Sequence, residues 1–120
     1  MTIETGSLWD DLPARPLDAE LTNVLLERPA FRIERIVSTG QVTPEGQWYD
    51  QKTDEWVLVV KGRARLRIEG EAQDQELGEG DFILLPAHCR HRVTWTDPDR
   101  PTVWLAIHFA ASPNGPRRSR

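Results

Sequence analysis

Short runs of alternating apolar and polar residues, separated by turn residues, follow one another along most of this sequence. The clearest is residues 63–68, where Arg63, Arg65 and Arg67 alternate with apolar side chains. A period of two places successive side chains on opposite faces of a β-strand. Further short strands are expected at residues 23–27, 31–37, 54–60, 74–77, 82–85, 90–96 and 103–109. Because no helical pattern interrupts them, they predict an all-β sandwich or barrel.

The chain of 120 residues has the length of a single domain. Residues 1–22 contain two prolines and no clear period, so we expect an N-terminal arm laid on the body. Residues 23–110 hold the expected strands of the β-barrel. Residues 111–120 are rich in Pro, Gly, Ser and Arg, which predicts a disordered basic tail.

Charge and composition exclude several classes of partner. The net charge of −4 argues against a nucleic-acid-binding protein, and the basic cluster at the end of the chain lies in the predicted tail. No apolar run approaches the length of a membrane span, so we expect no membrane partner. The single cysteine, Cys89, fits a reducing compartment, and the N-terminus lacks the apolar region of a signal peptide. The expected location is the cytoplasm.

The stretch from Gly80 to Trp95 organises the chain. A Gly-Asp turn leads into the apolar run 82–85, which Pro86 ends. In the strand that follows, the alternation places His91 and Trp95 on one face with Val93 between them. An apolar face predicts that this side points into the barrel. We therefore expect His91 inside, with Trp95 lining the same pocket.

These residues resemble the cupin superfamily. Gly80 is followed six positions later by Pro86 and five further on by His91, as in the second cupin motif. Glu55 and Gly62 have the separation found in the first motif. The resemblance covers roughly residues 31–109. It implies a double-stranded β-helix, a small barrel of the jelly-roll type.

In this family, two histidines and a glutamate of the first motif and a histidine of the second hold a divalent metal. Only Glu55 and His91 match here, because the histidine pair is replaced. The motif allows two lengths for the gap between the histidine pair and the glutamate. With the shorter gap, Tyr49 and Gln51 stand at the positions of the two histidines. With the longer gap, these positions are taken by Trp48 and Asp50. The predicted metal ligands are Gln51, Glu55 and His91, for Zn, Fe, Ni or Mn.

A second interpretation needs no metal. Glu55 and His91 form a hydrogen-bonded acid and base in a pocket, where they are the predicted catalytic residues. A third is that both are remnants of an ancestral site in a non-catalytic barrel that binds a ligand or has a structural role. The resemblance leaves open whether the protein is an enzyme. Isomerase, lyase and dioxygenase chemistries, acting on a small polar metabolite, all remain open.

Three aromatic residues are the predicted ligand contacts. Trp48 and Tyr49 come at the start of the first motif, where they can stack on a ligand at the barrel mouth. Trp95 is the third. His88 is expected in a surface turn, and the orientation of His108 is left open because both faces of its strand are apolar.

An outward apolar stripe predicts a partner subunit. Trp56, Leu58 and Val60 point away from the face that carries Glu55. Such a stripe needs a cover, which either the N-terminal strands or a second copy supplies. Because dimers of this kind are common among cupins, we expect a homodimer.

Overall fold

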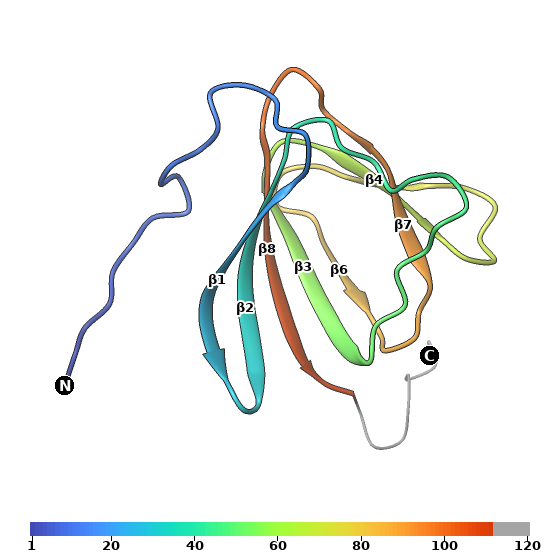
Figure 1. Cartoon of the computed structure of the whole chain (residues 1–120). Helices are drawn as coiled ribbons and strands as arrows, with labels where there is room; N and C mark the ends of the chain where they lie inside the picture. Colours follow the sequence, from blue (N-terminus) through green and yellow to red (C-terminus); the bar gives the residue numbers. More distant parts are fainter. Residues whose placement is uncertain (112–120) are drawn as a thin grey trace.

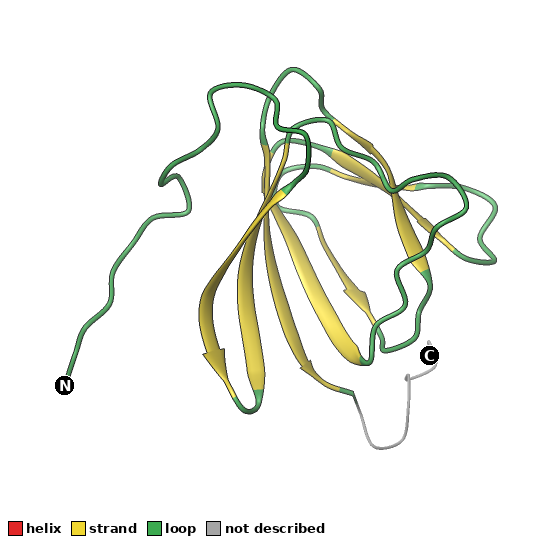
Figure 2. Ribbon diagram, viewed as in Figure 1, coloured by secondary structure: helices red, strands yellow, loops and turns green. Residues whose placement is uncertain are grey.

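The computed structural model describes residues 1–111 and is built from β-strands alone (Figures 1 and 2). The predicted all-β class is therefore confirmed in this part of the chain, where no residue is helical. The strands are β1 (Leu21–Arg28), β2 (Phe31–Ser38), β3 (Thr53–Lys61), β4 (Ala64–Ile68), β5 (Gln75–Leu77), β6 (Phe82–Leu85), β7 (His91–Thr96) and β8 (Thr102–Ala110).

Two antiparallel sheets enclose the core. The larger has the strand order β1-β2-β8-β3-β6, and the smaller has the order β5-β4-β7. Side chains from both sheets meet in the buried hydrophobic cluster, which includes Val59, Leu85 and Ala106 from the larger sheet and Leu66 and Leu77 from the smaller. Fully burying one such side chain contributes about 1.5–3 kcal/mol, so this cluster stabilises the contact between the sheets.

The pairing of β3 with β8 decides which polar side chains point inward. Glu55 lies directly opposite His108, and Val57 lies opposite Ala106. Side chains opposite each other in an antiparallel pair share one face. Since Val57 and Ala106 are buried in the core, Glu55 and His108 also face the interior. His108 therefore points inward, which the sequence did not decide because both faces of β8 are apolar.

A β-bulge in β7 turns Trp95 outward. Leu66 of β4 pairs with Val93, but the preceding Arg65 pairs with Trp95, so Thr94 is an extra residue in the ladder. The expectation that Trp95 shares the inward face of His91 is therefore wrong. The extra residue reverses the alternation, and the Arg65 guanidinium lies 5.4 Å from the centre of the outward Trp95 ring.

The turn between β3 and β4 requires glycine. Gly62 has a φ of +94° in the left-handed region, which L side chains rarely adopt. A Cβ atom added there would lie 2.6 Å from the Thr102 hydroxyl oxygen and 2.8 Å from the Thr102 Cα. Gly62, the glycine of the first motif, therefore allows the turn from β3 to β4 to lie in close contact with Thr102 at the start of β8.

The N-terminal residues cross the outer face of the larger sheet. The Arg35 guanidinium donates to the carbonyl oxygen of Leu8 at 3.0 Å and also to that of Asp10. The Lys61 ammonium lies 5.6 Å from the centre of the Trp9 ring. β1 begins at Leu21, two residues inside the predicted arm of residues 1–22. The predicted tail lies outside the described residues except for Ala111.

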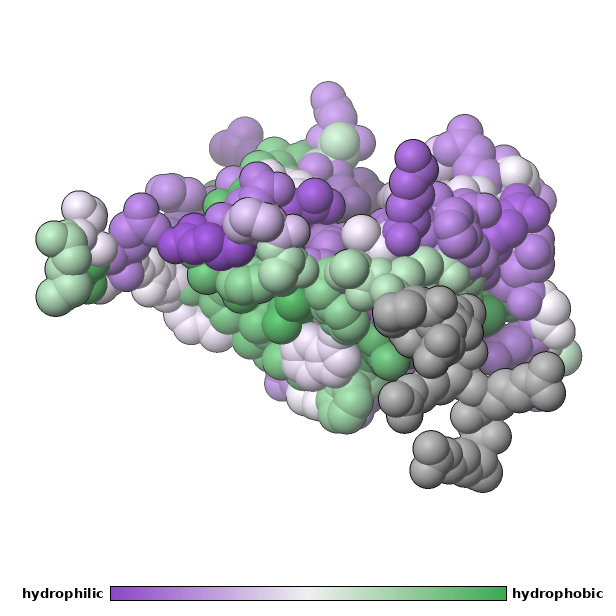
Figure 3. All heavy atoms as spheres, turned by 90° about the horizontal axis from the view of Figure 1, so that it is seen from below, coloured by the Kyte–Doolittle hydropathy of each residue, from purple (hydrophilic) through white to green (hydrophobic). Residues whose placement is uncertain are grey.

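The rest of that outer face is apolar and accessible. Phe82 and Leu84 of β6 are 62% and 51% exposed. Trp56 and Leu58 lie on the side of β3 opposite Glu55, as predicted, and are partly exposed. The Trp56 and Phe82 rings contact at 5.4 Å between centres. Figure 3 shows apolar side chains gathered in one continuous area beside a polar one. Among residues 1–111, no helix is long and apolar enough to cross a membrane.

Candidate functional site

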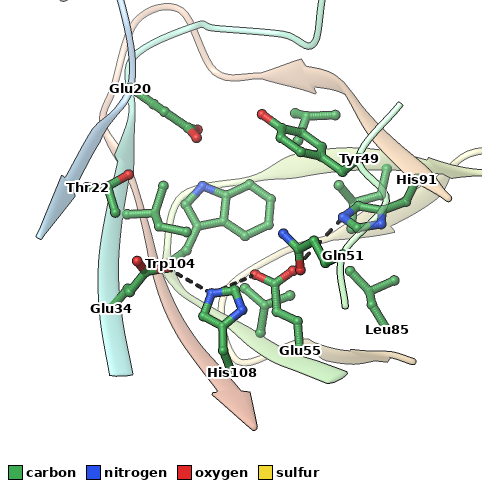
Figure 4. A pocket seen from close by; sticks show the side chains of 14 residues that line it. Glu20, Thr22, Glu34, Tyr49, Gln51, Glu55, Leu85, His91, Trp104 and His108 are labelled. Carbon is green, nitrogen blue, oxygen red and sulfur yellow. Dashed lines mark hydrogen bonds and ion pairs between the residues drawn. The ribbon is translucent and has the colours of Figure 1, made fainter. Parts of the chain in front are cut away.

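A cavity of about 270 Å³ lies between the two sheets (Figure 4). β1, β2, β3, β6 and β8 of the larger sheet form one wall, while β4, β7 and the segment before β3 form the other. Its lining residues are Glu20, Thr22, Glu34, Ile36, Tyr49, Gln51, Glu55, Val57, Leu66, Leu85, His91, Val93, Trp104 and His108. Apolar walls with a few convergent polar groups are typical of a small-molecule site.

Glu55 is the central polar group of this cavity. The residue is 7% exposed. The Nε2 atoms of two imidazoles flank its carboxyl group, His108 at 3.8 Å and His91 at 4.0 Å. Both distances exceed hydrogen-bond length. Among the described residues, none donates a hydrogen bond to Glu55, which makes it a buried carboxyl group with space in front of it.

His91 is held in one tautomer. Its Nδ1 lies 2.8 Å from the carbonyl oxygen of Cys89. Since a carbonyl can only accept, Nδ1 carries a proton. In the neutral ring, Nε2 then presents its lone pair toward Glu55. The ring stacks on Tyr49 with 5.5 Å between centres, and two backbone hydrogen bonds join these residues.

His108 has the opposite arrangement at Nε2. This atom lies 2.8 Å from Oε1 of Glu34, so it donates to that carboxylate. The other Glu34 oxygen accepts from Arg32 at 3.2 Å. Glu55 therefore lies between an N–H group of His108 and a lone pair of His91. Only the His91 side offers a lone pair that can take a proton from this carboxyl, because the His108 N–H is donated to Glu34.

Burial dominates the electrostatics of Glu55. Desolvation raises the pKa of its carboxyl, and the attractions of His108 and His91 offset this only in part. At the cavity mouth the Glu20 side chain remains accessible to solvent, but surrounding atoms desolvate its carboxyl enough to raise that pKa as well. Burial also raises the pKa of the Cys89 thiol, which argues against Cys89 as a nucleophile.

The structure distinguishes between the two gaps that the first motif allows. Tyr49 and Gln51 line the cavity, whereas Trp48 and Asp50 do not. Asp50 lies 2.8 Å from Nδ1 of His88 on the surface, so His88 is the surface turn residue that was expected. The shorter gap is the one that brings its residues to Glu55 and His91.

Of the three predicted aromatic contacts, only Tyr49 reaches the cavity. The Trp48 ring lies 5.8 Å from the guanidinium groups of both Arg90 and Arg92. Trp95 lies outside because of the bulge at Thr94. The predicted catalytic pair, Glu55 and His91, and the predicted metal ligands all line the cavity, as Figure 4 shows.

The sequence did not identify Glu20, Glu34 and Trp104 as cavity residues, and it left the direction of His108 open. His108 and Trp104 alternate correctly for one face of β8, but the other face is equally apolar. Glu34 lies between Ile33 and Arg35 in a strand where charged and apolar residues are mixed, so no local pattern assigns it to the inner face. Glu20 precedes the first strand and carries no pattern at all.

The donor set does not fit the metal centre of the family type. Tyr49 and Gln51 stand where that centre has imidazoles, and a phenol and an amide are poorer ligands for these metals. His108 cannot replace them as it stands, because its Nε2 is hydrogen-bonded to Glu34. Within residues 1–111, no three His, Cys, Asp or Glu side chains are grouped to hold a metal ion.

Known proteins are similar to this chain in sequence or in fold. The family model described as "Cupin domain" matches residues 36–108. The 3-hydroxyanthranilate 3,4-dioxygenase of Brucella anthropi is 30% identical over 114 residues, 89% of this chain; the chain spans only 58% of that protein's length.

Two solved structures complete the comparison. A putative mannose-6-phosphate isomerase from Ralstonia eutropha is 48% identical, with a TM-score of 0.87 over 91% of this chain and 100% of that one. An RmlC-like cupin from Methanocaldococcus jannaschii with a double-stranded β-helix has a TM-score of 0.68 at 14% identity, over 92% and 94% of the two chains. The predicted double-stranded β-helix is confirmed, and the chain belongs to the cupin domain family.

Proposed function

We propose that this cupin domain binds a small polar metabolite in its interior cavity, with Glu55 as the central recognition group. One observation carries the proposal: Glu55 is 7% exposed, its carboxyl receives no hydrogen bond from the described residues, and it faces about 270 Å³ of space. A buried carboxyl without a donor is costly to keep. A bound ligand that donates to Glu55 removes this cost.

The same geometry supports proton transfer as the chemistry of the site. His91 presents a lone pair from Nε2, and Glu55 has a raised pKa, so the two groups can hold a proton in turn. In this proposal a bound ligand with an acidic C–H or O–H group exchanges its proton with them. Isomerisation is the simplest such reaction, and it needs no resident cofactor.

A metabolite panel tests the binding proposal. Thermal unfolding is followed with sugars, hydroxy acids, oxo acids, amino acids and amines, for the parent and for a cavity-filling variant, Val93→Phe. Val93 lines the cavity, whereas Val42 is 50% exposed on a loop, so Val42→Phe is the matched control.

The expected result is that at least one compound raises the Tm of the parent and of Val42→Phe but not that of Val93→Phe. If no compound acts, or if the shifts persist in Val93→Phe, the cavity is not the binding site and the proposal fails.

A divalent metal held by Gln51, Glu55 and His91 is the second candidate. The observation in its favour is that all three predicted ligands line the same cavity, with the lone pair of His91 Nε2 directed at Glu55. Elemental analysis of protein purified without an affinity tag tests it, beside Glu55→Gln and His91→Ala. Near-stoichiometric Zn, Fe, Ni or Mn that falls in both variants would support the metal site. It would also overturn the metal-free proposal.

The assembly and the location are further parts of the proposal. A second copy of the chain covers the apolar outer face around Trp56, Phe82 and Leu84, which is too exposed for an isolated subunit to leave open. Cytoplasmic location stays a prediction supported by the single Cys89. The net charge of −4 supports the absence of a nucleic-acid partner.

A further inference from the structure

We propose that the ligand of this cavity is a small organic cation, a protonated amine whose ammonium group sits against Glu55. This inference rests on the proposed function and names the class of molecule that the cavity selects. It is carried by the charge of the lining, by the missing hydrogen-bond donor at Glu55 and by two aromatic rings.

The lining is acidic without a basic counterpart. Three carboxyl groups belong to it, those of Glu20, Glu34 and Glu55, and none of its residues is Lys or Arg. Arg32 reaches one oxygen of Glu34 from beside the cavity, and His108 reaches the other. With Arg32 and His108 charged and His91 in the neutral form described above, these two cations offset only two of the three carboxylates. The cavity keeps a negative charge, which attracts cations and repels anions.

Glu55 needs a donor that the protein does not supply. Glu55 is 7% exposed, and among the described residues its carboxyl has ionic contacts only with the imidazoles of His108 and His91, at 3.8 and 4.0 Å. An ammonium group carries two or three N–H donors and a positive charge. Placed at Glu55, it forms a charge-assisted hydrogen bond, the stronger kind.

Two aromatic side chains give the cation a second kind of contact. The Trp104 indole is 5% exposed and is held by a hydrogen bond of 3.0 Å from its Nε1 to the Ser38 hydroxyl. Tyr49 lines the cavity nearer the mouth, and Figure 4 shows both rings bordering the same space. Aromatic faces attract ammonium groups, with Trp the most effective.

The acidic lining argues against a phosphorylated sugar. The 48% identical structure from Ralstonia eutropha is that of a putative mannose-6-phosphate isomerase. A phosphate group is doubly charged near neutral pH and is usually held by Arg, Lys or a helix N-terminus. The described lining offers none of these, and Glu20 at the mouth repels an approaching anion. A protonated amine is instead attracted by Glu20 at the mouth and by Glu55 inside the cavity.

Three probes of nearly equal shape but different charge test whether the cavity selects its ligand by charge. Benzylammonium, benzyl alcohol and benzoate are titrated into the parent protein at pH 7, and binding is followed by the indole N–H signal of Trp104 in two-dimensional NMR. A Trp104→Phe variant assigns that signal. Glu55→Gln removes the central charge, and Glu20→Gln removes the charge at the mouth in case the first variant fails to fold. Glu76→Gln removes an exposed charge that pairs with Arg63 outside the cavity.

We expect benzylammonium to bind at least tenfold more tightly than the alcohol, and benzoate to bind least. Glu55→Gln weakens benzylammonium about tenfold or more, the loss that follows from one charged hydrogen bond of about 1.5–3 kcal/mol. Glu76→Gln leaves the affinity for benzylammonium unchanged. Glu20→Gln lowers this affinity by less than Glu55→Gln does.

Equal binding of the three probes, or a preference for benzoate, would overturn the cation assignment and leave the cavity as a binding site. The same holds if no probe binds while metabolites still raise the Tm of the parent but not of Val93→Phe. If neither probes nor metabolites bind, both the inference and the proposed function are wrong.

Discussion

A backbone carbonyl gives His91 its chemical role. Because the Cys89 oxygen takes the Nδ1 proton, the Nε2 lone pair remains for the cavity. His108 has its Nε2 proton directed at Glu34 instead. Two histidines on either side of one carboxyl group therefore differ in what they offer it, and this difference comes from their hydrogen-bond partners alone.

Asp74 allows a prediction about pH at the level of one residue. It accepts hydrogen bonds of 2.6 Å from both Thr94, the bulge residue, and Arg67. These bonds, with that of Thr94 first, lower the pKa of Asp74. Its contribution to stability is therefore present above the unfolded-state pKa and is lost as the pH falls through the folded-state value.

We expect Asp74→Asn to lower the Tm at pH 7 by about 2 °C, the size expected for a partly exposed pair. The difference between the two proteins shrinks as the pH is lowered toward 3. Thermal unfolding across pH 3–7 checks this, with Glu76→Gln as the matched control. A difference that stays constant with pH would show that the carboxylate charge has no part in it.

Local sequence patterns predicted most of the strands. The alternation over residues 63–68 contains β4 with one extra residue, and the apolar run 82–85 coincides with β6. The bulge at Thr94 depends on how β7 pairs with a strand distant in the chain, so no local period reveals it. β8 is central in its sheet, which makes both of its faces apolar and hides the inward direction of His108. Half of the site was therefore open to sequence reasoning.

The turn from β3 to β4 supplies a test at the level of the elements. Gly62→Ala combines an unfavourable φ with a clash against Thr102, while Gly70→Ala has a similar φ of +90° and no atom within 4 Å of the new Cβ. We expect the first to lower the free energy of unfolding by about 3 kcal/mol or more and the second by about 1 kcal/mol. Urea unfolding compares them. Equal losses would mean that the close approach of this turn to β8 is not essential.

At the scale of the whole molecule, two surfaces of the larger sheet have different roles. Its inner face supplies most of the acidic cavity, and its outer face presents Trp56, Phe82 and Leu84 beyond the area that the N-terminal residues cross. A dimer through the outer face leaves the cavity mouth free, since the two faces of a sheet point in opposite directions.

Sedimentation velocity tests this dimer with one substitution and one control. Phe82 is 62% exposed in the single chain, so Phe82→Lys should leave the subunit folded while placing a charge in the interface. We expect the parent and the exposed-loop variant Val42→Lys to be dimers, and Phe82→Lys to dissociate with a Kd at least tenfold weaker. A monomeric parent, or a Phe82→Lys protein as tightly dimeric as the parent, would show that this face is not the interface.

If Glu55 is kept for a ligand at a cost to folding, its replacement stabilises the free protein, and the free energy of unfolding of Glu55→Gln at pH 7 tests this most directly. Burial raises the Glu55 pKa more than the histidines lower it, so the ionised form is less favourable in the folded chain. We predict that Glu55→Gln has a higher free energy of unfolding at pH 7 than the parent, because the neutral amide avoids the cost of burying an ionised carboxylate. This gain shrinks as the pH falls below the folded-state pKa and is gone below the unfolded-state pKa, where the parent carboxyl is protonated in both states. A loss of about 2 kcal/mol or more would identify Glu55 as a structural partner of His91 and His108 and contradict the account.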